Sequence, residues 1–172
     1  RRIRQEYILR RTKHMLCKSQ DELKLPELNV EVVSLPFSSQ KEELFYNRIK
    51  ENELRSYREF GEFETNAHAF TILLRLKQTS IHPQLVIDSY KKKYKRPFKD
   101  WTGTSTKISY IINQIKKEQQ KTIIFCSFTK EIEIFEDKLS KIGMKTDRIT
   151  GKISPTERNK ILERSEEIDV LL

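Results

Sequence analysis

The sequence has few of the residues that build disulfide scaffolds, metal centres and membrane spans. Its 172 residues include two cysteines and three histidines. Cys17 and Cys126 are far apart in the chain, which favours a reducing environment over a disulfide framework. The histidines have no metal-ligand spacing with each other or with the cysteines, so we predict no metal site. No apolar run approaches the ~20 residues of a membrane helix, and no secretory signal pattern opens the chain; we therefore expect no membrane partner.

The motifs of a complete catalytic site are absent too. The sequence contains no G-x-x-x-x-G-K-[ST] phosphate loop and no acidic cluster that would hold Mg²⁺. It has no defensible Ser-His-Asp or Cys-His arrangement, and its many glutamates and lysines fall on predicted helix surfaces. We therefore predict no catalytic residue in this chain. Because the chain opens on Arg1 and ends within an apolar run at Leu172, we expect it to be a piece of a longer protein.

Positive charge is what the sequence has in excess. The formal net charge is +9 at pH 7, and 34% of the residues are charged against 36% that are hydrophobic. Such a balance indicates a polar, helix-rich domain with an anionic partner, and nucleic acid is the leading candidate. The alternative is a lysine-rich surface that only keeps the protein in solution.

Residues 121–172 carry the clearest structural pattern. Apolar runs predict short strands over residues 122–126, 144–149 and 168–172. Helical spacing of apolar residues follows the first strand, and Gly143 stands where a helix end favours positive φ. Ser154 and Pro155 open a second helix. The alternation predicts an α/β fold with parallel strands, crossover helices and a sheet covered on both faces.

Two polar loops follow the first two predicted strands. They consist of Ser127, Phe128 and Thr129, and of Thr150, Gly151 and Lys152. Loops after parallel strands meet at one edge of a sheet, where ligands usually bind. Backbone N–H groups at helix starts, with hydroxyls and a lysine beside them, suit phosphate oxygens. The alternative is that Ser127, Thr129 and Ser154 only cap helices.

The part of the chain before residue 105 is predicted to be mainly helical. The expected elements are a strand over residues 29–35, a helix that a capping box at Ser39 to Glu42 opens and Gly61 breaks, and a helix over residues 66–80. The last of these has a wide apolar face, which we expect in the core; its residues are Phe70, Leu73, Leu74 and Leu76. An isoleucine stripe predicts a further helix over residues 106–119, which Ser105 can cap.

Residues 86–101 form the most basic stretch, with aromatic residues interleaved. Its cations include Lys91, Lys92, Lys93, Lys95 and Arg96. Such a segment can follow a phosphate backbone, with an affinity that falls steeply as salt is added. The alternative is a flexible surface loop that its aromatic residues anchor to the core.

Six blocks of sequence occur in an order that one family shares. They are Ile8–Lys13; Leu25-Pro26 with Leu35, Gln40 and Tyr46; Leu73–Gln78 with His82-Pro83; Ser105–Ile108; residues 121–139; and Arg148–Arg158. Together they resemble, over essentially the whole chain, the SWI/SNF-type chromatin-remodelling ATPases, which are double-stranded-DNA translocases of helicase superfamily two. Within this family, two features are most similar to the branch that contains transcription termination factor two and the baculovirus global transactivator. They are a long insertion and the sequence Ser-Thr-Lys-Ile-Ser at residues 105–109.

This resemblance implies a domain plan. Residues 1–28 would end the first helicase lobe, residues 29–104 would form a helical protrusion with a basic aromatic loop, and residues 105–172 would begin the second, RecA-like lobe. The fold would be a partial RecA-like parallel sheet after a mainly helical segment. Two departures from the family pattern stand out: Cys126-Ser127 replaces Ser-Gln, which puts the DNA contact there in doubt, and Ser165 replaces a phenylalanine, which implies a looser core.

The resemblance also implies partners. ATP and Mg²⁺ would bind the parent protein outside this chain, and the six residues of the two polar loops would contact DNA phosphates. Double-stranded DNA is then the expected partner, with chromatin or the transcription machinery beyond it, in the nucleus or in the host nucleus of a virus. Two alternatives stay open: a binding module that holds nucleic acid or protein without hydrolysis, and a purely structural α/β domain.

Overall fold

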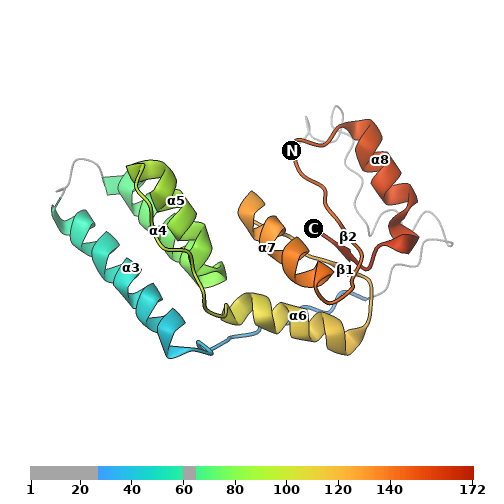
Figure 1. Ribbon diagram of the computed structural model, residues 1–172, viewed down its shortest axis with the longest axis horizontal. Coiled ribbons are helices and arrows are strands. Elements are labelled where there is room, and N and C mark those ends of the chain that lie inside the picture. Colours follow the sequence, from blue (N-terminus) through green and yellow to red (C-terminus); the bar gives the residue numbers. More distant parts are fainter. Residues whose placement is uncertain (1–26, 60–64) are drawn as a thin grey trace, which may run out of the picture. The chain divides into compact units, whose positions relative to one another are not determined.

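A computed structural model describes residues 27–59 and 65–172 (Figure 1). The chain divides into two compact units, one up to Ser34 and one from Leu35 to Leu172. The expectations for the block at Ile8–Lys13 and for the helix break at Gly61 lie outside the described residues. The domain boundaries at 28/29 and 104/105 stay predictions.

A small parallel sheet organises the C-terminal part of the chain. Its strands are β1 (Thr122–Ile123), β2 (Thr146–Asp147) and β3 (Val170–Leu171), in the order β1-β3-β2. Hydrogen bonds extend the pairing beyond these short spans: the Ile124 N–H donates to the Leu171 carbonyl at 2.9 Å and the Ile149 N–H to the Leu172 carbonyl at 2.7 Å. Helices α7 (Thr129–Ser140) and α8 (Pro155–Glu163) make the crossovers, and a 3₁₀ turn, η2 (Ser165–Glu167), precedes β3. The predicted α/β class is confirmed.

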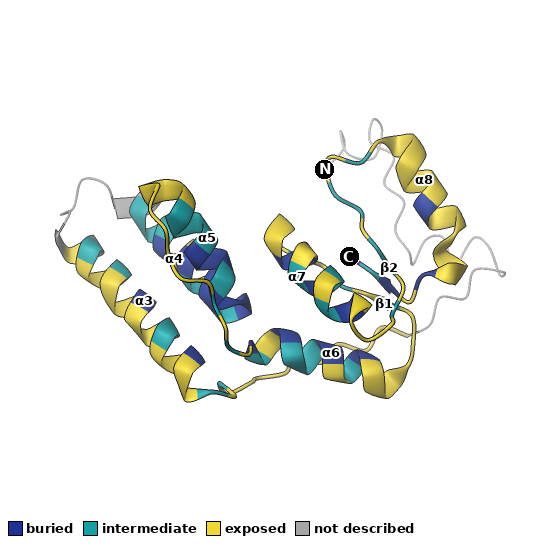
Figure 2. Cartoon of the chain, in the orientation of Figure 1, coloured by how far each residue is buried: buried dark blue, intermediate teal, exposed yellow. Residues whose placement is uncertain are grey.

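One apolar core joins this sheet to α7 and to α6 (Thr106–Glu118). Its buried members are Ile108, Ile112, Ile115, Ile132, Phe135, Leu139, Val170 and Leu172. The isoleucine stripe is therefore the buried face of α6, as its i, i+4, i+7 spacing predicts. Gly143 lies just after α7 with φ of 79°, so the positive φ expected there is confirmed. By contrast, Figure 2 shows that α8 is exposed over most of its surface, with Ile161 its buried residue.

The second face of β1 is bare among the described residues. Along the strand, side chains alternate between its two faces. Ile123 and Phe125 on one face are 63% and 93% exposed, whereas Ile124 and Cys126 on the other face pack against the core. The expectation of a sheet covered on both faces is therefore wrong for β1 within the described chain. The physical reason is that α6 and α7 share one core on the same side of the sheet.

Three helices precede α6: α3 (Gln40–Glu59), α4 (Thr65–Ile81) and α5 (Pro83–Tyr94). None of the described helices is long and apolar enough to cross a membrane. The strand expected over residues 29–35 is wrong, because this segment forms no regular structure and Val30 and Val32 are 73% and 88% exposed. Alternation of apolar residues makes a strand only where a neighbouring strand pairs with it.

The face of α4 that we expected in the core is mostly exposed, and Leu76 is the half-buried member of its four apolar residues. Phe70 and Leu73 are 71% and 62% exposed, and Leu74 is also exposed. The buried face instead carries Ile72 with polar neighbours, such as Arg75 at 9% exposure. The polar side chains there find hydrogen-bond partners on α4 and α5, so their burial is compensated.

The basic stretch is mostly helical, so the flexible-loop interpretation is wrong for residues 86–94. Pro83 stands at the first helical position, and the His82 imidazole caps the helix by accepting the Gln84 N–H at 3.1 Å. Buried Leu85 and Val86 then fix one face of α5 against its neighbours. The helix ends at Lys95, whose φ of 50° is left-handed.

Candidate nucleic-acid interface

The two polar loops lie where the sequence places them, after the carboxyl ends of β1 and β2. Because both strands run parallel to β3, their ends face the same edge of the sheet. The side chains of Ser127, Thr129 and Lys152 are exposed, while Phe128 and Thr150 are half-buried. The edge of the sheet therefore presents hydroxyls and one ammonium group to solvent.

The first loop is held by an acid that sequence reasoning missed. The carboxylate of Glu131, buried in the first turn of α7, accepts the N–H of Ser127 at 2.8 Å and the N–H of Phe128 at 3.3 Å. Those two N–H groups are thus not free for a phosphate. Neither Ser127 nor Thr129 caps the helix with its side chain, so the helix-capping alternative is wrong for this pair.

What the first loop still offers is a smaller set of donors. Among the described residues, the backbone N–H groups of Thr129 and Lys130 have no acceptor, as expected for the first turn of a helix. The hydroxyls of Ser127 and Thr129 stand beside them without a hydrogen bond to the described chain. The Lys130 ammonium lies 2.8 Å from the Glu133 carboxylate, which raises the pKa of Lys130.

The second loop is a tight turn that leads into α8. The Ile153 N–H donates to the Thr150 carbonyl at 3.1 Å, and the Lys152 N–H lies 3.4 Å from the Thr150 hydroxyl. Ser154 then caps α8, accepting the Glu157 N–H at 3.2 Å, so the helix-capping interpretation is confirmed for Ser154. No described residue forms an ion pair with the Lys152 ammonium.

Gly151 has no evident structural reason to be glycine. It does not adopt a positive φ, and a Cβ added there would meet no atom within 4 Å. Glycine is also used where a ligand approaches the backbone closely. The open space over Gly151 is compatible with such an approach beside Lys152.

A second basic surface lies at the end of α5. Exposed cations gather there: Lys92, Lys93, Lys95, Arg96 and Lys99. Three rings, Tyr90, Tyr94 and Phe98, cluster with centroids 5.7 to 6.4 Å apart, so residues 95–98 fold back over the helix. The aromatic residues thus anchor the segment, while its cations remain in solvent.

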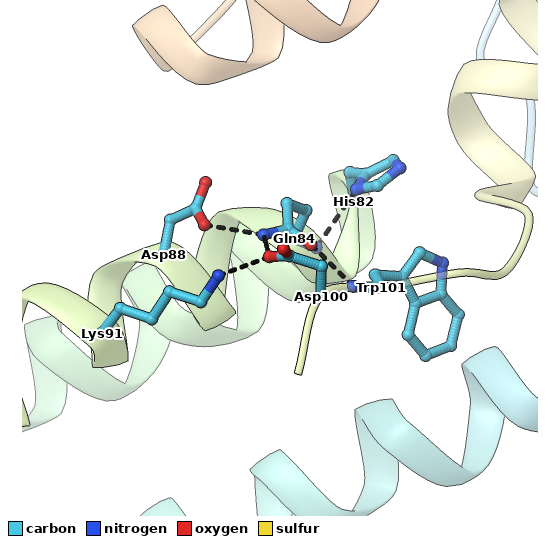
Figure 3. Close-up of polar contacts among 6 residues, drawn as sticks. All are labelled: His82, Gln84, Asp88, Lys91, Asp100 and Trp101. Carbon is cyan, nitrogen blue, oxygen red and sulfur yellow. Dashed lines mark hydrogen bonds and ion pairs between the residues drawn. The ribbon is translucent and has the colours of Figure 1, made fainter. Parts of the chain in front are cut away.

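A polar network holds the far end of this segment (Figure 3). The Gln84 amide donates to Asp88 at 2.7 Å and to Asp100 at 2.6 Å, and its oxygen accepts the Trp101 N–H at 2.7 Å. Lys91 pairs with Asp100, and the hydrogen bonds from Lys91 and Gln84 lower the pKa of Asp100. Of the five cations in this stretch that the sequence suggested for DNA contact, Lys91 is therefore engaged within the chain.

The cysteine among the described residues, Cys126, is not activated as a nucleophile. Burial, with a smaller effect from Glu131, raises the pKa of the Cys126 thiol to about 12, so it stays protonated at neutral pH. Within residues 27–59 and 65–172, no group of three or more His, Cys, Asp or Glu side chains could hold a metal ion.

Comparison with known protein families gives one match, and it covers both polar loops. Residues 106–172 match the family model of the helicase conserved C-terminal domain. This part of the chain is similar to the helicase C-terminal domain. Both polar loops lie within it, whereas the basic surface of α5 lies before it. No curated protein matches the chain.

One solved structure shares the fold. The chain is similar to the C-terminal domain of the Sulfolobus solfataricus SWI2/SNF2 ATPase, with a TM-score of 0.58 and 18% identity over 77% of this chain. It spans 57% of the length of that structure. A second match is the C-terminal part of the Fun30 ATPase domain, with a TM-score of 0.34 and 17% identity, covering 73% of this chain and 43% of that one. The resemblance to helicases is confirmed by the family model and by the fold shared with the first of these structures. The assignment to a branch stays a prediction.

Proposed function

We propose that the chain is part of an ATP-driven motor that moves along double-stranded DNA, and that its helicase C-terminal domain holds DNA phosphates through the two polar loops. The observation that carries the proposal is their shared position at one edge of the sheet. There, exposed hydroxyls, free first-turn N–H groups and Lys152 come together in a domain of helicase type. Contacts of this kind position a strand without reading its bases.

The basic surface of α5 is proposed as a second DNA contact. Its cations stand on a helix end and a segment that the aromatic cluster and Gln84 hold in place. A preorganised surface loses less conformational entropy on binding than a flexible loop would. Lys92, Lys93, Lys95 and Arg96 carry this contact, and Lys91 supports it by pairing with Asp100.

ATP and Mg²⁺ belong to the parent protein in this proposal. The chain lacks a phosphate-loop motif, and no described acidic cluster suits Mg²⁺. We therefore assign no step of hydrolysis to residues 27–59 and 65–172. Chromatin or the transcription machinery as partner, and a nuclear location, are proposals of the same kind.

A binding module without hydrolysis is the second candidate. The basic surface of α5 favours it, because this surface needs no nucleotide to hold a phosphate backbone. The two candidates differ in one measurable property of the longer protein, which is whether duplex DNA stimulates ATP hydrolysis.

The test is ATP hydrolysis by the longer protein with and without duplex DNA. We expect strong stimulation by DNA, and we expect Lys152→Ala to weaken the stimulated rate more than the basal rate. Lys117→Ala, at an exposed position of α6 away from the loops, is the matched control. Equal losses of both rates with Lys152→Ala would contradict the phosphate contact, and no hydrolysis at all would favour the binding module.

The chain by itself gives a complementary test. Residues 1–172 should show no ATP hydrolysis at any DNA concentration, because the nucleotide groups lie elsewhere. DNA-stimulated turnover by this chain would contradict our assignment of the catalytic groups.

A further inference from the structure

The start of α3, the end of α4 and the start of α6 meet at one joint, where side chains form hydrogen bonds to residues outside their own helix. The joint consists of Ser38, Glu42, Ile81, Ser105 and Thr106. Ser39 caps α3 as the capping-box pattern predicts, with its hydroxyl accepting the Glu42 N–H at 3.2 Å. The Glu42 carboxylate, however, reaches α6. Its two oxygens accept the Thr106 N–H at 3.1 and 3.0 Å, and one of them accepts the Thr106 hydroxyl at 2.5 Å.

Ser105 likewise forms its side-chain hydrogen bond with another helix. It stands at the N-cap position of α6, but its hydroxyl donates to the carbonyl of Ile81, the last residue of α4, at 2.6 Å. Glu42 therefore caps α6, and Ser105 satisfies the end of α4. Ser38 adds to the joint, because its N–H donates to the Thr106 hydroxyl oxygen at 2.8 Å.

The joint is as buried as the apolar core. Glu42 and Ser105 are both 0% exposed, and the adjoining Ile81 and Ile108 are 2% and 0% exposed. A buried polar group that loses its partner pays the full cost of its lost hydration. Bending at residues 101–106 would separate Glu42 from Thr106 and Ser105 from Ile81 at once, so the joint resists the hinge motion that a single connecting segment otherwise allows.

We propose that Glu42 is a positioning residue that fixes the helical segment, α3 to α5, on α6, so that the basic surface and the helicase C-terminal domain move as one body. The inference does not depend on the proposed DNA function, because none of the joint residues is a proposed DNA contact. A two-body arrangement, in which α5 swings freely on the linker, is the opposing case.

The experiment measures the distance distribution between two spin labels in the full 172-residue chain. Labels at Lys92→Cys on α5 and Lys160→Cys on α8 are read by pulsed electron resonance, with Cys17 and Cys126 replaced by serine. Both label sites are exposed. We expect a single narrow distribution in the labelled chain with Glu42 intact. We expect a broader one in Glu42→Ala, which removes the carboxylate, and in Glu42→Gln, whose amide places a donor against the donors of Thr106.

Glu43→Gln is the matched control. Glu43 is the next residue, lies in the same first turn of α3 and has the same formal charge, but it is exposed. It should leave the distribution narrow. Glu42→Ala should also lower the melting temperature by about 5 °C or more, but lower stability with an unchanged distribution would overturn the positioning role.

Thr106 keeps the proposal testable if the Glu42 variants fail to fold. Thr106→Val removes the hydroxyl, and we expect a broader distribution, whereas Thr106→Ser keeps the hydroxyl and should restore the narrow one. A distribution for Thr106→Val as narrow as that of the control would refute the proposal.

Discussion

Acidification should destabilise the protein in part through the imidazole of His82. This residue is 8% exposed, and its Nδ1 caps α5 by accepting the Gln84 N–H. Burial, followed by the nearby Lys138 ammonium, lowers the pKa of His82 from 6.5 to about 4, while Asp88 opposes the shift. A protonated Nδ1 cannot accept a hydrogen bond, so the cap exists only in the neutral form.

The sign and the size of the effect follow from proton linkage. Between pH 6.5 and pH 4 the unfolded imidazole binds a proton that the folded one does not, so the free energy of unfolding falls as the pH falls through this window. At about 1.4 kcal/mol per pH unit, the full drop is at most about 3 kcal/mol, and about 2 kcal/mol of it should be lost by pH 4.5.

The assay is urea unfolding at pH 7 and at pH 4.5, on the natural chain and on His82→Asn. Asparagine is a good N-cap that does not titrate in this range. Carboxylates titrate in both proteins and cancel in the comparison. We expect the natural chain to lose about 2 kcal/mol more than the variant; equal losses in the two proteins would refute the reasoning.

Two further perturbations test the basic surface and the core. The triple variant Lys92→Ala, Lys93→Ala, Lys95→Ala should weaken binding to duplex DNA and reduce the slope of log affinity against log salt by up to about 0.9 per lost contact. The control, Lys116→Ala with Lys117→Ala at exposed positions of α6, should change this slope little. Equal slopes for both variants would contradict a DNA contact at α5. Phe135→Ala should lower the free energy of unfolding by about 3–5 kcal/mol in urea titrations, because Phe135 is 0% exposed at the centre of the core, and a loss below about 1 kcal/mol would contradict that central place.

Periodicity predicted the C-terminal part of the fold well and the helical segment less well. The isoleucine stripe of α6 and the alternation of strands and helices are local patterns that the core directly requires. The helix α5 escaped prediction because its lysine density resembled a loop, and its cap is a histidine rather than a common capping residue. Which face of α4 is buried depends on side chains of other helices, and the spacing of residues within α4 does not reveal them.

The candidate site shows the same division. The two loops could be located from sequence, because strand ends fix where they lie. The carboxylate that occupies two of their N–H groups was missed, since Glu131 stands at a capping position after Phe128, which is not a usual cap. Glu42 was recognised as half of a capping box, but its partner Thr106 is 64 residues away, and no local pattern reports such a contact.

The bare face of β1 bears on how the chain behaves at high concentration. Phe125 and Ile123 expose apolar side chains on a strand whose one partner among the described residues is β3, and such an edge can pair with a second molecule. The net charge of +9 keeps molecules apart, but only until salt screens it. Raising the ionic strength should therefore weaken the proposed DNA contacts and favour self-association at the same time, because both the proposed affinity and the repulsion between molecules depend on the same positive charge.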